Sequence, residues 1–491
     1  MLAPGSPNGE YYGSDYQVIA GMLQENMQHN SSVNFSLRSE TLNFLQFTRR
    51  MLLAFPAGMF IRSHIRKNKR LNYILQFKEL LQVRNNIEKG SFAYDTLLFK
   101  QPALQVLQNK SHLANLVCLA ILFGDEFIDG IAQHYGKQNI KTILTNSQFD
   151  YNLHYACDGK ACRLYYGFDI CDILPGWVLN SINSKYGITY KAFYGHLLFL
   201  LDEINIHLNR LNSAKQEEAA ELICRVCNRC FDTYKADIHS FDSNYSLQSL
   251  LDYQKTKDDD IIQVLLTLRA VLLDKKKLQY QVHFSSWSSM VRSMQLYDDM
   301  QDAATDCDFQ MNSLCYFAKN YFYDEWQWLQ QNKLTLQKLS GLTLHTTIGL
   351  NMPGSCILCY QYACNIAHTK LNWVQRKIQN YLWRKNWLGV NNPLLKPSSF
   401  CISAVMNRSE KSAALKLHFI QKKIMQVDED IIPEEMKLAY IIDMVLFDDE
   451  LRECLFKTVT LKEKYFLIGC YLEFPVHKKA QLAKRLLAIY K

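Results

Sequence analysis

The scarcity of proline and glycine is the feature that most constrains what this chain can fold into. Its 491 residues contain only 10 prolines and 19 glycines. β-Sandwiches and β-barrels turn often and use these two residues to do so, whereas long helices need few of them. The sequence also shows no sustained alternation of apolar and polar side chains and no succession of strand–helix–strand units. We therefore predict an all-α protein built from long helices.

The overall composition is typical of a folded protein with a large hydrophobic core. Apolar and aromatic residues make up 48% of the chain and charged residues 21%, which is too apolar for a disordered protein. The net charge is only +8, and the basic residues are not clustered, so we expect no nucleic-acid partner. No stretch offers 18 uninterrupted apolar residues, so we expect no membrane-spanning segment.

The N-terminal residues and the cysteines indicate a cellular compartment. The chain begins without the basic and apolar regions of a secretory signal peptide. The 15 cysteines are therefore expected to be reduced, buried thiols of a cytoplasmic protein.

Breaks in the helical pattern divide the chain into segments. Residues 1–35 are polar and are expected to be a flexible N-terminus. A helical domain is expected over residues 36–390, with a connection or insert at about 146–187, where glycine, proline and aspartate interrupt the pattern. After a linker around Pro393, residues 400–491 are expected to form a smaller C-terminal helical segment.

The first of two acidic motifs follows a strongly apolar helical stretch, Leu113 to Ile131. Asp125 and Asp129 are spaced i,i+4, and Glu126 lies three residues before Asp129. On a helix these carboxylates share one face.

The second acidic motif is denser than the first. Asp298, Asp302 and Asp306 follow an i, i+4, i+8 spacing, with Asp299 beside the first of them. Like charges at this spacing repel and destabilise a helix unless a cation compensates them. Mg²⁺ takes oxygen ligands and is commonly held by one or two carboxylates together with substrate phosphates. The alternative is that both acidic faces are simply solvated.

Together the two motifs resemble those of the class I terpene synthase and trans-isoprenoid diphosphate synthase superfamily. The segment Asp125 to Asp129 is similar to the first, DDxxD-type motif of that superfamily, and Asp298 to Asp306 is similar to its second metal motif. The resemblance covers about residues 100–390. It implies an isoprenoid-synthase-like helical bundle with a smaller C-terminal helical appendage. It also implies that the seven acidic residues are metal ligands or their neighbours, with Asp125, Asp129, Asp298 and Asp302 catalytic.

The implied function is that of a class I terpene synthase. Three Mg²⁺ ions would bind with an acyclic prenyl diphosphate, and the ionised substrate would cyclise or eliminate. The resemblance allows a homodimer and peripheral membrane contact through a lipophilic product. The large-terpene synthases of bacteria are the group that the size of the chain most resembles.

Departures from the superfamily pattern keep two alternatives open. Residues 130–137 lack the Arg-Arg pair that chain-elongating synthases carry after the first motif, which argues against chain elongation. A prenyltransferase, or a condensing enzyme similar to squalene and phytoene synthases, remains an alternative, because Asp125 and Asp129 also fit a DxxxD motif. A non-catalytic helical scaffold is the third hypothesis. No DxDD motif is present, so nothing indicates class II cyclisation.

Further candidates follow from what such a site would need. A diphosphate needs basic partners, and a carbocation needs aromatic faces and exclusion of water. The candidates for diphosphate binding are Arg292, Lys319, Arg376 and Arg384, and those for cation stabilisation are Tyr316, Phe317, Tyr321 and Trp326.

The cysteine-rich segment Cys224, Cys227 and Cys230 is a competing metal site. Its CxxCxxC spacing can begin an iron–sulfur site, but the usual fourth cysteine followed by proline is missing. A strongly helix-forming sequence leads directly into it, so we expect three cysteines on one buried helix face. Cys157 and Cys162 lack a matching second pair and are not expected to bind zinc.

Overall fold

The computed structural model describes residues 11–32, 112–144, 146, 150–183, 186–240, 245–273, 298–300, 302–307, 311–339, 341–370, 412–446, 448–469 and 475–490, together with 284, 288, 292, 295–296, 402 and 405–406. These residues are mainly helical, with four short strands, so the prediction of an all-α fold is confirmed. Among them, no helix has both the length and the apolar character needed to cross a membrane.

The chain divides into two units. Unit 1 comprises Met1–Leu37, Ser240–Lys255 and Ser285–Lys491, and unit 2 comprises Arg38–His239 and Thr256–Phe284. This division differs from the single helical domain expected over residues 36–390. The described C-terminal helices are also not a separate appendage, because they share one hydrophobic core with the helices between residues 313 and 370.

Unit 1 is built from helices around that core. Its most closely packed pair is α19 (Glu434–Val445) with α22 (Val476–Ile489). The other helices with bounds wholly inside the unit are α1 (Tyr11–Ser32), α13 (Ser313–Tyr321), α14 (Tyr323–Leu336), α15 (Gly341–Asn351), α16 (Pro353–Lys370), α18 (Ala413–Met425), α20 (Asp449–Thr458) and α21 (Leu461–Gly469).

Helix α1 corrects the expectation of a flexible N-terminus. It packs against α16 and places Ile19, Met22 and Leu23 in the core of unit 1. The Asn26 amide donates to the backbone oxygen of Gln361 at 2.7 Å. The segment is polar in composition, and its few apolar side chains become a core face because α16 and α22 lie against it.

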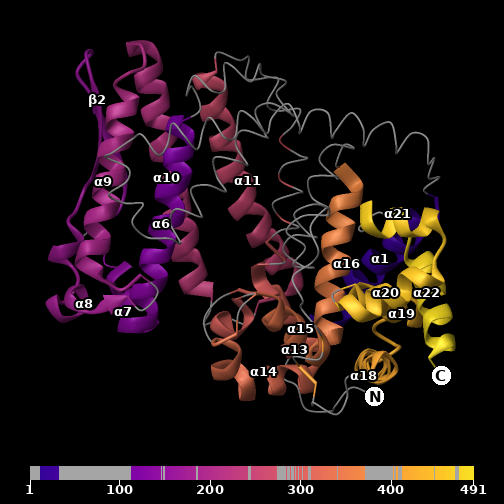
Figure 1. The fold of residues 1–491 in the computed structure, drawn as a ribbon. Helices are drawn as coiled ribbons and strands as arrows, with labels where there is room; N and C mark the ends of the chain where they lie inside the picture. The colour runs from indigo at the N-terminus through magenta and orange to yellow at the C-terminus, as the bar shows by residue number, and fades with distance from the viewer. Residues whose placement is uncertain are drawn as a thin grey trace. The chain divides into compact units, whose positions relative to one another are not determined.

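Unit 2 contains α6 (His112–Tyr135), α7 (Lys137–Leu144), α8 (Gly176–Asn180), α9 (Tyr190–Leu208) and α10 (Ser213–Ser240). The part of α11 (Leu247–Leu272) from Thr256 onwards also belongs to it. Helices α6 and α9 pack side by side (Figure 1). Phe123 and Phe193 stack at this contact, with ring centroids 4.2 Å apart. Two hydrophobic clusters form the core of this unit.

The predicted interruption at 146–187 contains two small hairpins. β1 (Leu153–Cys157) pairs antiparallel with β2 (Cys162–Tyr166), and β3 (Ile182–Asn183) pairs with β4 (Ile188–Thr189). A short 3₁₀ helix, Ile170–Asp172, lies between the hairpins in sequence. In the β1–β2 turn, Gly159 adopts a φ of +81°, a conformation that favours glycine.

Asparagine side chains cover both edges of the β1–β2 hairpin. The Asn205 amide accepts from the backbone N–H of Leu164 at 2.7 Å and donates to its carbonyl at 3.0 Å. Asn228 on α10 pairs in the same two-way manner with Leu153, at 2.7 and 3.0 Å. These amides act as short substitutes for a neighbouring strand, so the edge groups of the hairpin that they engage are satisfied.

Candidate functional site: two acidic helix motifs

The first acidic motif lies on α6, as predicted. Phe123 and Phe127 are 1% and 2% exposed and face the core of unit 2. Asp125 lies two residues from each of them, about 200° around the helix, and is exposed. Glu126 and Asp129 are partly exposed. The apolar spacing of α6 therefore orients the Asp125 carboxylate towards solvent.

The second acidic motif is also helical wherever the structure describes it. Met300, Ala303 and Ala304 are buried in the core of unit 1. Asp298 and Asp302, one turn apart, are exposed. Both residues of the predicted i,i+4 pair are thus helical and exposed, on either side of position 301, which lies outside the described residues.

Asp306, one further turn along, has a different environment. It is partly exposed, and the Asn312 side chain donates to its carboxylate at 3.1 Å. Asn312 also donates to the backbone oxygen of Asp299 at 2.7 Å and accepts from the backbone N–H of Cys315, which caps α13. Asp306 is therefore held in place from the start of the next helix.

Asp299 is buried, at 3% exposure, although it is the sequence neighbour of Asp298. Its carboxylate accepts from the Gln254 side chain at 3.0 Å, from the Ser313 backbone N–H at 2.8 Å and from the Gln295 side chain at 3.3 Å. These bonds connect α11 with the start of α13 inside unit 1. The chemistry of these donors gives Asp299 a structural role and does not fit the metal-ligand role that the resemblance implied.

The exposed pair fits the requirements of Mg²⁺ better than the whole acidic set does. Mg²⁺ is usually bound by one or two carboxylates plus substrate phosphates and water, so a complete protein cage is not required. Asp298 and Asp302 offer two carboxylates in that manner. Within the described residues, no group of three or more His, Cys, Asp or Glu side chains is arranged to hold a metal ion. The first motif belongs to unit 2 and the second to unit 1.

The candidate basic residues have different positions. The Arg292 guanidinium donates to the Ser288 hydroxyl at 2.8 Å. Lys319 is exposed on α13. Arg376 and Arg384 lie outside the residues that the structure describes.

The candidate aromatic residues are mostly part of the core. Tyr316 and Phe317 are buried, while Tyr321 and Trp326 pack against the same cluster. The hydroxyls of Tyr316 and Tyr321 both donate to the Asp15 carboxylate on α1, at 2.6 and 3.1 Å. Burial, with the nearby Asp15 carboxylate, raises the pKa of Tyr316 far above its ordinary value. Packing and hydrogen bonding within unit 1 thus explain why tyrosine stands at these two positions.

The sequence analysis did not identify one carboxylate, on α14, that binds the first turn of α16. Glu325 on α14 accepts from the backbone N–H groups of Gly354 and Ser355, at 2.7 and 2.9 Å, and from the Ser355 hydroxyl at 2.6 Å. Burial raises the pKa of Glu325 to about 7, although these three bonds act in the opposite direction. The only feature of the sequence that indicated the start of α16 was Pro353, because proline is favoured at the first position of a helix. Nothing in the sequence connects Glu325 with that position.

The cysteine segment of α10 is part of the core, as predicted. Cys224 is buried, and Cys227 and Cys230 pack against the same cluster. Burial raises the pKa of Cys224 to about 12 and that of Cys227 well above its ordinary value. Such thiols stay protonated and are poor metal ligands.

The expectation that the cysteines are reduced is wrong for one pair. Cys157 and Cys162 form a disulfide across the β1–β2 hairpin. The hairpin brings the two residues together, and this pairing could not be read from a spacing of five residues alone.

Comparisons with protein-family models, with curated proteins and with solved structures find no match to this chain.

Proposed function

We propose that the protein is a Mg²⁺-dependent class I terpene synthase that ionises an acyclic prenyl diphosphate. The observation that carries the proposal is the pair Asp298 and Asp302, which are helical, exposed and four residues apart, while their helical neighbours Met300 and Ala303 are buried. Like charges at this spacing repel each other on a helix, and Mg²⁺ is commonly bound by one or two carboxylates together with substrate phosphates.

In this proposal six of the seven acidic residues have a defined task. Asp298 and Asp302 bind Mg²⁺, and Asp306, which Asn312 holds by a hydrogen bond, is the third carboxylate of the motif. Asp125 and Asp129 on α6 bind Mg²⁺ in the same way through the first motif. When bound, the ion supplies Lewis-acid stabilisation of the charge on the diphosphate leaving group. Asp299 anchors the helix of the second motif to α13.

The test is diphosphate release from prenyl diphosphates of increasing chain length, with and without Mg²⁺, followed by product analysis by gas chromatography. Magnesium-dependent release with an olefin or cyclic alcohol from a single substrate is the expected result. A product that joins two prenyl units would favour the condensing enzyme. The absence of release from every substrate tested would overturn the proposal in favour of a non-catalytic helical scaffold.

Conservative variants connect the activity to the acidic motifs. We expect Asp298→Asn, Asp302→Asn and Asp125→Asn each to lose diphosphate release. Asp202→Asn is the matched control, because Asp202 is an exposed aspartate on α9 outside both motifs. Equal activity in all four variants would contradict the assignment of these carboxylates.

A further inference from the structure

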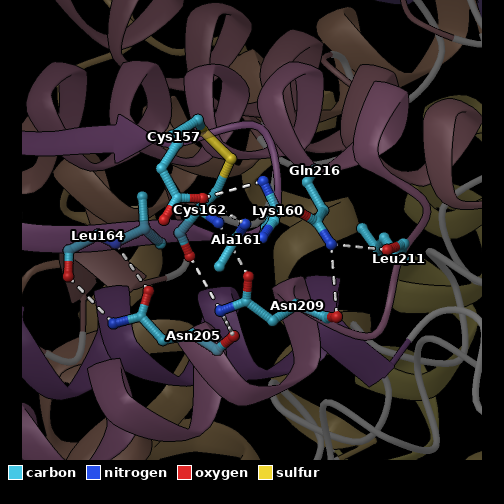
Figure 2. Close-up of a disulfide and its surroundings, with 10 residues drawn as sticks. Cys157, Lys160, Ala161, Cys162, Leu164, Asn205, Asn209, Leu211 and Gln216 are labelled. Carbon is cyan, nitrogen blue, oxygen red and sulfur yellow. Dashed lines mark hydrogen bonds between the residues drawn. A yellow bond between two sulfur atoms is a disulfide. The ribbon is translucent and has the colours of Figure 1, made fainter.

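The tip of the β1–β2 hairpin places two cysteines directly opposite each other. Cys157 and Cys162 are register partners and are joined by a disulfide, with their Cα atoms 4.1 Å apart (Figure 2). The N–H and C=O of Cys162 point away from β1 and pair with the Asn209 amide, at 2.9 and 3.0 Å. The two cysteines therefore occupy a non-hydrogen-bonded position of the ladder, where facing side chains come closest.

The hairpin is held by contacts that do not involve the disulfide. Asn205 and Asn228 satisfy the outer edges of the two strands. The Asp158 carboxylate accepts from the backbone N–H groups of Lys160 and Ala161, at 2.9 and 2.8 Å, and so fixes the turn. Leu153 and Leu164 are buried in the core of unit 2. The two sulfur atoms consequently stay neighbours whether or not they are bonded.

The environments of the two cysteines differ strongly. Cys157 is exposed, at the rim of the hairpin. Cys162 is 2% exposed and belongs to the apolar core cluster of unit 2. The Cys157 side of the disulfide is therefore the side open to a dissolved thiol, while the Cys162 side is buried.

We propose that Cys157 and Cys162 form a reversible thiol–disulfide site for small thiols of the glutathione class. The attacking thiolate bonds to the Cys157 sulfur, the S–S bond breaks, and Cys162 leaves as a thiolate that takes up a proton. A second small thiolate then attacks the small-molecule sulfur of the mixed disulfide. The bond to the Cys157 sulfur breaks, the small-molecule disulfide is released, and Cys157 leaves as a thiolate that takes up a proton. The balance is two small thiols oxidised for one protein disulfide reduced. In the reverse direction, Cys162 is the resolving thiol that closes the ring.

This inference is independent of the proposed diphosphate chemistry. The site lies on the β1–β2 hairpin, and neither acidic motif contributes a residue to it. Reduction is expected to leave the fold of unit 2 in place, because the asparagine and aspartate contacts persist.

The experiment uses the full-length protein, equilibrated with reduced or oxidised glutathione and then alkylated without denaturant. Peptide mapping by mass spectrometry follows each cysteine. In the reduced protein we expect rapid alkylation of Cys157 and little of Cys162, and after oxidation we expect loss of alkylation at Cys157 with a direct Cys157–Cys162 crosslink. A Cys157 that remains alkylatable after oxidation would overturn the proposal, as would a crosslink that reduced glutathione cannot remove from the folded protein.

Single variants test the different roles of the two sulfurs. Cys162→Ser removes the resolving thiol, so a mixed disulfide with glutathione should accumulate on Cys157. Cys157→Ser should acquire no glutathione at Cys162, because that side chain is buried. Equal glutathionylation of the two variants would overturn the assignment. Far-UV circular dichroism of each variant, compared with the wild type, checks that unit 2 keeps its fold.

Discussion

Lys479 on α22 donates a hydrogen bond of 2.9 Å to Asp443 on α19, and the two side chains are only 3% and 1% exposed. The Tyr360 hydroxyl accepts a second bond from the Lys479 ammonium at 3.0 Å. This ion pair connects the two most closely packed helices of unit 1 from inside its core.

Removing one partner of this pair should destabilise unit 1 strongly. Asp443→Ala leaves the Lys479 charge buried without its carboxylate, which typically costs about 3–5 kcal/mol. The control is Glu434→Ala, since the Glu434–Lys484 pair joins the same two helices but is more than half exposed. Exposed pairs contribute roughly 0–1 kcal/mol. Urea denaturation measures both, and similar losses in the two variants would contradict a buried, structural ion pair.

Substitutions of the neighbouring residues Asp298 and Asp299 should differ in their effect on stability. Asp298→Ala is expected to leave the melting temperature unchanged or slightly higher, because it relieves repulsion with Asp302. Asp299→Ala removes a buried acceptor of charged hydrogen bonds and should cost about 1.5–3 kcal/mol. Thermal denaturation without metal distinguishes the two. A marked loss for Asp298→Ala would mean that this residue also has a structural role.

The stability of the protein should carry a pH dependence from Glu325. Its folded-state pKa is raised from 4.5 to about 7, so its contribution is complete below pH 4.5 and is lost as the pH rises through 7. Glu325→Gln removes this dependence, so the variant should gain stability relative to the wild type between pH 4.5 and 7, whatever constant offset the substitution adds.

His345 should contribute a pH dependence of stability with the opposite sign to that of Glu325. Burial lowers its pKa from 6.5 to about 4, so its contribution is present above pH 6.5 and is lost as the pH falls through 4. The variant His345→Gln should therefore gain stability relative to the wild type as the pH falls from 6.5 to 4. Urea denaturation midpoints at several pH values check both signs. If the midpoints of Glu325→Gln and the wild type changed in parallel with pH, the raised pKa of Glu325 would be contradicted.

Gly354, at the start of α16, should not tolerate a larger side chain. A Cβ there would lie 2.7 Å from the Phe322 ring, which is itself packed in the core. Gly354→Ala should cost about 1–3 kcal/mol by overpacking. Gly21→Ala on α1 is the matched control in the same unit, because no atom lies within 4 Å of the added Cβ. That exposed helical change should stabilise by about 0.5–1 kcal/mol.

The cysteines of α10 should contain no metal. The purified protein is expected to be colourless, with no stoichiometric iron or zinc by elemental analysis. Cys227→Ala should cost on the order of 1 kcal/mol, as for a small group in the core. Losing a cluster ligand would cost far more, because metal binding is coupled to folding. One iron cluster or one zinc ion per chain would refute this interpretation.

Local features of the sequence were enough to predict much of the fold. The rarity of proline and glycine, the apolar spacing around Phe123 and Phe127, and the punctuation at 146–187 indicate helices, a buried face and a break, because each depends on residues close together in the chain. The i,i+4 spacing of Asp298 and Asp302 also follows from the helix itself.

Burial and partnership were decided only by the tertiary structure. Asp298 and Asp299 are chemically alike neighbours, yet the second is buried because Gln254 and Ser313 converge on it from other helices. Glu325 meets α16, and α1 becomes ordered, through contacts between residues far apart in sequence. Cys157 bonds with Cys162 because the hairpin register places them opposite each other. The sequence by itself determined which segments are helical, since that preference is local. Only packing decided which carboxylates stay exposed and which thiols pair, since these depend on distant residues brought into contact.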